Sequence, residues 1–113
     1  MPLLIYTTAP SKKEARKLAK KLCKRRLAAC VQTQKIKSHY HWQGKLCIES
    51  ETLIAIKTRK RLYKKVRRFL RRHHSYEVPQ IVAFKTHKVD KHYQKWFKTT
   101  LNPQHPKPNV SAH

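Results

Sequence analysis

Two adjacent histidines, His73 and His74, are the residues whose types point most directly to chemistry. Imidazole is a good ligand for copper and zinc, and the carboxylate of Glu77 follows closely enough to join them. Neighbouring side chains on a helix diverge by about 100°, so one ion engages both histidines only where the helix has unwound. The alternative is structural, with both imidazoles capping the C-terminal carbonyl groups of the preceding helix.

Cys30 is a further candidate metal ligand, although a free cysteine in an apolar strand is more often a small core residue. His39 and His41 lie two residues apart on one strand face and could clamp a metal ion, with plain solvation as the alternative. The three cysteines include no Cys-x-x-Cys pair, so the sequence indicates neither a disulfide framework nor a zinc ribbon. We therefore expect a reducing, cytoplasmic setting.

A set of aromatic residues and one lysine is able to line a cleft between subunits: Tyr40, Trp42, Lys57, Tyr76 and Trp96. Aromatic walls with Lys57 and Glu77 suit a small anionic ligand, and the alternative is that these residues form the core of an oligomer. One glycine in 113 residues cannot build a Gly-rich phosphate loop, and no nucleophile-elbow pattern is present. The sequence indicates no enzyme.

The formal net charge of +23 is extreme for a chain of this length, because 28 Lys and Arg residues face five acidic ones. Such a surface attracts polyanions, so a nucleic acid bound by the outer helix faces is a possible partner. Few aromatic residues interleave with these cations, however, and a merely solvated basic surface is the alternative. The first residues do not resemble a signal peptide, and no apolar run approaches the roughly 18 residues of a membrane span.

Hydrophobic periodicity predicts six principal elements in one domain over 1–102, followed by a flexible, proline-rich tail over 103–113. A strand over 2–8 ends before Pro10, and Ser11 and Glu14 form a capping box that opens an amphipathic helix. A long hairpin over 28–58, with a two-residue turn at Gln43 and Gly44, precedes a second helix over 59–72. A strand over 80–84 and a short helix that Asp90 caps follow. The β-α-β-β-α-β order predicts an α+β, ferredoxin-like fold with both long helices on one face of an antiparallel sheet.

The hairpin is longer than the helices that cover it. An arm of about 14 residues spans on the order of 45 Å, whereas a helix of about 15 residues spans about 22 Å. The projecting half carries Ile36, Tyr40, Trp42 and Leu46, which are costly to leave in water. The length difference predicts that the overhang pairs with another subunit in a head-to-tail ring, and fraying beyond Gln34 is the alternative.

Several short runs together resemble the CutA family of divalent-cation-tolerance proteins: Leu-Ala-Ala-Cys at 27–30, Tyr-His-Trp-Gln-Gly-Lys at 40–45 and Tyr-Glu-Val-Pro at 76–79. The resemblance extends over about 3–101 and implies a heat-resistant homotrimer of ferredoxin-like subunits with a link to copper and other divalent ions. Two adjacent histidines are proposed copper ligands in that family, and His73 and His74 match them by position. Thr7 stands where some members carry a cysteine ligand, and Ser75 and Gln80 also depart from the family pattern.

The sequence thus predicts a cytoplasmic, trimeric protein of this type that binds copper or another divalent cation weakly. The predicted metal ligands are His73, His74, Glu77 and Cys30. The alternatives are an electrostatic nucleic-acid-binding protein and a structural or signalling trimer with a small anionic ligand in an intersubunit cleft.

Overall fold

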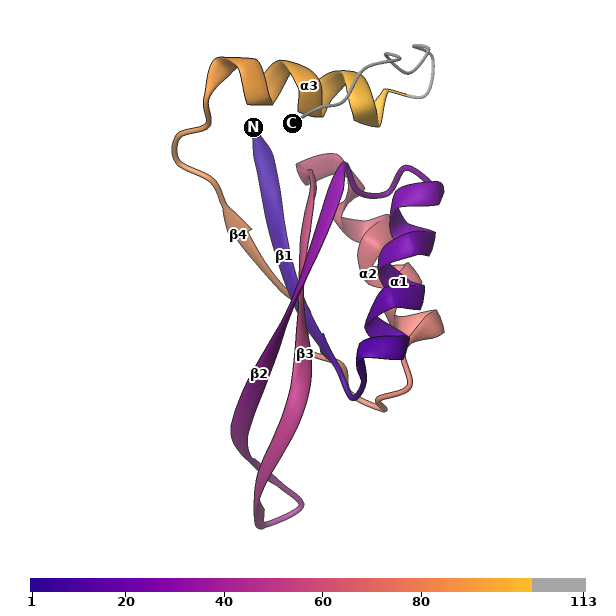
Figure 1. The fold of residues 1–113 in the computed structure, drawn as a ribbon, viewed down its shortest axis with the longest axis vertical. Coiled ribbons are helices and arrows are strands. Elements are labelled where there is room, and N and C mark those ends of the chain that lie inside the picture. The colour runs from indigo at the N-terminus through magenta and orange to yellow at the C-terminus, as the bar shows by residue number, and fades with distance from the viewer. Residues whose placement is uncertain (103–113) are drawn as a thin grey trace.

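The computed structural model describes residues 1–102, and the predicted tail over 103–113 lies outside them. Four strands form one antiparallel sheet in the order β2-β3-β1-β4, and the two long helices α1 and α2 cover a single face of it (Figure 1). The predicted ferredoxin-like α+β arrangement is confirmed. Within the described residues, no helix is long and apolar enough to cross a membrane.

Strand β1, Pro2–Ala9, occupies a central position between β3 and β4. Its alternate residues Leu3, Ile5 and Ala9 are buried under the helices, which explains the apolar run at the start of the chain. The strand runs one residue beyond the predicted range of 2–8, because pairing with β3 extends to Ala9 opposite Thr52.

Helix α1, Lys12–Lys24, buries one stripe formed by Ala15, Leu18 and Leu22. The predicted N-cap is confirmed, because the Ser11 hydroxyl accepts a hydrogen bond of 3.1 Å from the amide of Glu14. The Glu14 carboxylate does not complete the predicted capping box. It instead accepts hydrogen bonds from the amide and hydroxyl groups of Ser75, 61 residues further along the chain.

The predicted helix over 59–72 begins later than its sequence pattern indicated. Arg59 is still the last residue of β3, opposite Pro2, and a 3-10 turn over Lys60–Leu62 leads into α2, Tyr63–His73. Val66, Phe69 and Leu70 are the buried residues of α2, and they pack into the same core as the stripe of α1.

The long hairpin consists of β2, Cys30–Trp42, and β3, Lys45–Arg59, paired without interruption from Cys30 opposite Lys57 to Trp42 opposite Lys45. Gln43 and Gly44 both have positive φ, 51° and 78°, so the predicted two-residue turn is confirmed. The hairpin, predicted to begin at residue 28, begins two residues later, at Cys30. Arg26 has a φ of 55°, and the amide of Leu27 donates back to the carbonyl of Leu22, so this segment closes α1 first.

The outer half of the hairpin projects beyond both helices, as its length predicts (Figure 1). Its apolar side chains are left largely in solvent, with exposed fractions of 43% for Trp42, 63% for Leu46 and 55% for Ile48. Within this single chain, therefore, the overhang has no hydrophobic cover of its own.

The remaining elements complete the opposite end of the molecule. Strand β4, Val82–Lys85, is shorter than predicted, because only these four residues pair with β1 and the predicted residues Gln80 and Ile81 stay outside the strand. Helix α3, Lys91–Leu101, lies across the end of the sheet that is remote from the hairpin tip (Figure 1). Asp90 caps it as predicted, accepting from the amides of His92 and Tyr93.

Candidate functional site

A cleft of about 720 Å³ lies between the outer half of the hairpin and the segment that follows α2. We call it the hairpin cleft. Residues of β2, β3 and the 75–80 segment line it together with Thr8 at the end of β1: Ser38, His39, Tyr40, Trp42, Glu49, Glu51, Ser75, Tyr76, Glu77, Val78 and Gln80. The projecting strands and the short linker thus form its two walls.

Three of the five acidic residues of this +23 chain line the hairpin cleft. Glu49 and Glu51 lie two residues apart on β3, so both side chains emerge on the same face of the strand. Glu77 belongs to the opposite wall. Three of the five carboxylates of a strongly basic chain thus lie around one cleft.

Two tyrosines lie against the carboxylates of β3. The Tyr76 hydroxyl donates a hydrogen bond of 2.7 Å to the buried carboxylate of Glu51. Burial, followed by this hydrogen bond and the charge of Glu51, raises the pKa of Tyr76 well above its usual range. Burial and a hydrogen bond to Glu49 likewise raise the pKa of Tyr40. Both phenols therefore remain protonated donors at neutral pH.

His74 ties the linker wall of the cleft to the sheet. Its side chain is fully buried, with Nε2 2.6 Å from the carbonyl oxygen of Thr8. Its Nδ1 accepts a hydrogen bond of 3.0 Å from the amide of Tyr76 and lies 3.6 Å from a carboxylate oxygen of Glu14. This network assigns the proton to Nε2 and uses both ring nitrogens. In this arrangement His74 positions the wall and presents no free nitrogen to a metal ion.

His73 faces a different environment from its neighbour. It is the last residue of α2, whereas His74 has already unwound to an extended conformation with φ −80° and ψ 142°. The His73 ring lies 4.5 Å from that of Phe69, and burial, with nearby Lys21 and other cations, lowers the pKa of His73. The two side chains diverge as the sequence predicts. The alternative that both cap helix carbonyls was wrong for His74, because its ring bonds to β1.

The structure divides the remaining predicted residues between two ends of the sheet. Tyr40, Trp42 and Tyr76 line the hairpin cleft with Glu77. Lys57 lies six residues beyond Glu51, a separation of about 20 Å along the strand.

Lys57 lies at the end of the sheet near α3. Its ammonium group is 3.4 Å from the hydroxyl of Tyr93, and the Tyr93 ring packs 5.3 Å from the ring of Trp96. Cys30 stands opposite Lys57 in the register. One chain therefore does not assemble the predicted anionic-ligand cleft around Lys57, nor the predicted metal set of His73, His74, Glu77 and Cys30. Among the residues that the structure describes, no three His, Cys, Asp or Glu side chains converge in a geometry that could hold a metal ion.

Sequence reasoning missed Glu49 and Glu51 as site residues and named His39 only as one half of a histidine pair. The signal was available, because carboxylates two apart on a strand are conspicuous in a chain with five acids. The sequence could not show that Glu77 lies in the same cleft as these two residues, because the linker that carries Glu77 is attached to β1 through the hydrogen bond of His74.

The sheet order, the paired helices and the projecting hairpin define the ferredoxin-like class of α+β proteins. Residues 3–100 match the protein family described as CutA1 divalent ion tolerance protein, and the chain belongs to that family. A divalent-cation tolerance protein CutA from Archaeoglobus fulgidus is 38% identical over 97 residues, covering 86% of this chain and 95% of the relative. The corresponding protein from Pyrococcus horikoshii is 33% identical over 94 residues. The match covers 83% of this chain and 92% of the relative.

Solved structures agree with the sequence comparison. A structure of the periplasmic divalent cation tolerance protein CutA from A. fulgidus superposes with a TM-score of 0.87 at 37% identity, covering 90% of this chain and 100% of that one. The crystal structure of CutA1 from P. horikoshii gives a TM-score of 0.84 at 31% identity, with 87% and 96% covered. The family name describes tolerance to divalent ions and no enzymatic reaction.

Proposed function

We propose that the protein binds divalent cations, copper among them, in the hairpin cleft and so contributes to divalent-cation tolerance without catalysing a reaction. The observation that carries this proposal is the gathering of three of five carboxylates in one cleft of a strongly basic chain. The tolerance named for its relatives supports the same class of ligand.

The chemistry of the lining fits a weak, adaptable cation site. The carboxylate of Glu51 is buried and accepts a hydrogen bond from Tyr76, whereas Glu77 is exposed, and so is Glu49 beside Tyr40. Carboxylate oxygens suit hard cations, and the imidazole of His39 in the same lining adds affinity for copper and zinc. Because these side chains do not converge within one chain, a bound ion keeps water ligands or draws further ligands from a neighbouring subunit.

We propose further that the neighbouring subunits form a homotrimer. Exposed Trp42, Leu46 and Ile48 on the overhang, with Val82 and Phe84 at 42% and 46% exposure on edge strand β4, give two apolar surfaces that need cover. Burying a large apolar side chain contributes roughly 1.5–3 kcal/mol, and a head-to-tail ring buries a tip and an edge at each contact. The number three comes from the family resemblance. Sedimentation equilibrium should find a trimer that dissociates more readily in Leu46→Ser/Ile48→Ser than in Gln32→Ser/Gln34→Ser, and a monomeric parent protein would refute this proposal.

The free thiols Cys30 and Cys47 favour a reducing compartment, and we place the protein in the cytoplasm on that ground. Relatives are named as periplasmic in A. fulgidus and chloroplastic in Arabidopsis thaliana, so fractionation of the source cells is the test. Recovery with periplasmic or organellar markers would contradict the assignment.

The cation proposal is testable through Trp42, which lines the cleft and reports on it once Trp96 is replaced by phenylalanine. Copper and zinc are titrated into this background and into Glu77→Gln, with Asp90→Asn as control. Both variants lose one exposed carboxylate, but Asp90 caps α3 outside the cleft and asparagine preserves the cap. We expect a loss of affinity of about tenfold or more for Glu77→Gln alone, since a direct charged contact contributes about 1.5–3 kcal/mol. Equal affinities in the two variants would overturn the assignment.

A further inference from the structure

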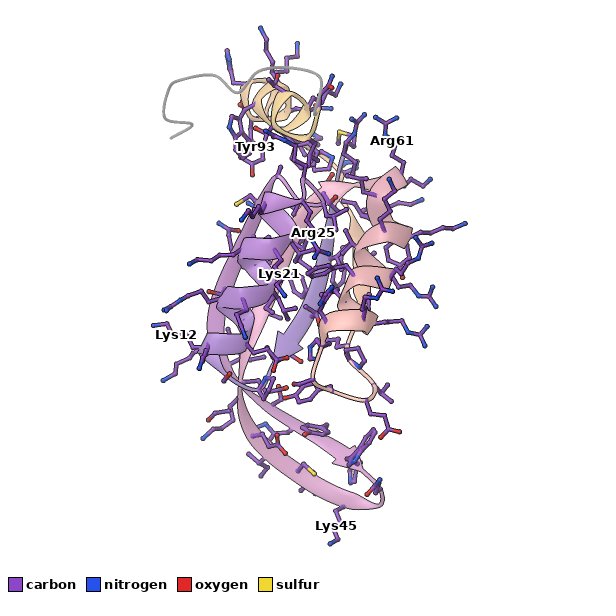
Figure 2. All side chains as sticks on the ribbon, turned by 90° about the vertical axis from the view of Figure 1, so that its right-hand side faces the viewer. Lys12, Lys21, Arg25, Lys45, Arg61 and Tyr93 are labelled. Carbon is purple, nitrogen blue, oxygen red and sulfur yellow. The ribbon has the colours of Figure 1, made fainter. Side chains whose placement is uncertain are left out.

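The outward surface of the helical layer is almost entirely cationic. Every exposed residue of α2 is Lys or Arg, and every exposed residue of α1 except Cys23 is Lys or Arg. Figure 2 shows these side chains fanning outward from both helices, with Lys12 and Lys21 marking α1. We call the exposed Lys and Arg residues of α1 and α2 the basic helical face.

Nothing in the described chain neutralises this face. Three carboxylates line the hairpin cleft, Asp90 caps α3 and Glu14 is held by Ser75. Within residues 1–102, the one carboxylate within 4 Å of a basic side chain is that of Glu14, 3.6 Å from Nδ1 of His74, so no Lys or Arg there is paired with an acid of the same range. The cations of both helices are therefore available to an external polyanion.

Spacing along α2 gives the face a linear feature. Lys64, Arg67, Arg68, Arg71 and Arg72 follow one helical stripe and surround a hollow of about 530 Å³. Eight residues of helix rise about 12 Å, and a nucleic-acid strand presents one phosphate per about 3.4 Å of duplex axis, so the stripe matches three to four phosphates. Four of its members are arginines, whose guanidinium groups can grip phosphate oxygens in pairs.

We propose that the basic helical face binds double-stranded nucleic acid through its sugar-phosphate backbone, without reading sequence. Single strands are bound by stacking bases on aromatic side chains, and neither helix exposes one, since Phe69 is buried and Tyr63 is half-buried. Helices that lie in a membrane surface insert an apolar face, whereas the apolar faces of α1 and α2 are consumed by the core. A rigid, uniformly charged rod is the polyanion that this surface fits.

This surface is separate from the hairpin cleft and from the apolar surfaces proposed to join subunits. The hairpin and β4 contribute none of its residues. Failure of cation binding therefore leaves this inference standing, and the reverse also holds.

The test is fluorescence anisotropy of a labelled 20-base-pair DNA duplex with the full-length protein over 50–200 mM salt. Each phosphate contact makes the slope of log K against log salt more negative by about 0.9. The variant Arg67→Gln/Arg68→Gln/Arg71→Gln/Arg72→Gln should flatten that slope by up to about 3.6. The control Lys88→Gln/Lys91→Gln/Lys95→Gln/Lys98→Gln removes the same charge from exposed positions in and before α3 and should change it by less than about 1.

An equal flattening of the salt slope in the two variants would show that binding depends on net charge alone, and it would overturn the assignment of binding to the basic helical face. Tighter binding to a 20-nucleotide single strand, or to phosphatidylserine vesicles with no measurable duplex binding, would overturn the duplex as its occupant. Circular dichroism and copper titration, unchanged in both variants, exclude misfolding as the cause of any loss.

Discussion

Replacing His74 with alanine separates a positioning role from a metal-binding role. The substitution leaves the Thr8 carbonyl and the Tyr76 amide without their partner, and both hydrogen bonds are partly buried. A buried polar group deprived of its partner costs about 1–3 kcal/mol, so with two such groups the free energy of unfolding should fall by about 2–6 kcal/mol. His73→Ala loses a tilted ring contact with Phe69, which is worth about 0.5–1.5 kcal/mol beyond the area that the half-buried ring covers.

Two conservative variants sharpen this comparison. The amide oxygen of asparagine can replace Nδ1 as acceptor from Tyr76, and the amide nitrogen of glutamine can replace Nε2 as donor to Thr8. His74→Asn and His74→Gln should therefore each recover part of the stability that His74→Ala loses. Guanidinium unfolding with a metal chelator, at one fixed protomer concentration, measures the series without contributions from bound metal or changing association. Equal stability of His74→Ala and His73→Ala in the presence of the chelator would contradict the positioning role of His74.

Three further outcomes follow from the same structure. Tyr76→Phe should lower the free energy of unfolding by about 1.5–3 kcal/mol at pH 7, since it strips a buried carboxylate of its donor. The pKa of Tyr76 is raised in the folded protein, so its contribution to the free energy of unfolding is fully present below the unfolded pKa of about 10 and is lost as pH rises above that value. Ultraviolet titration of tyrosinate can follow this loss. Burial and nearby cations lower the pKa of His73, so the free energy of unfolding should decline as pH falls below about 6.5. The variant His73→Gln should remove that part of the decline. An NMR titration midpoint of His73 above about 6.5 would contradict the lowered pKa. Gly44→Ala meets no atom within 4 Å, so its cost should be the backbone penalty of about 1–2 kcal/mol at φ 78°, with a larger loss on calorimetry indicating a contact at the tip.

Local patterns predicted the elements because each depends on nearby residues. The apolar stripe of α1, the N-cap at Ser11 and the turn at Gly44 are all encoded within a few positions, and the structure confirms them. The start of β2 escaped prediction because Arg26 adopts a positive φ that usually favours glycine, and no sequence signal marks it.

The site was harder to predict because its contacts join distant parts of the chain. The bond from His74 to Thr8 spans 66 residues, and that from Tyr76 to Glu51 spans 25. Residue types predicted His74 as a metal ligand, whereas in this structure its two ring nitrogens bond to the backbone of Thr8 and Tyr76. The close spacing of Glu49 and Glu51, in a chain with only five acidic residues, was the stronger indication of the cleft.

Anomalous diffraction at the copper edge, from crystals of the full-length protein grown with copper, can show whether the hairpin cleft holds a divalent cation. We expect an anomalous peak within about 2.5 Å of a carboxylate oxygen of Glu77 or Glu49. Copper bound at His73 or Cys30, with no anomalous peak in the cleft, would contradict it.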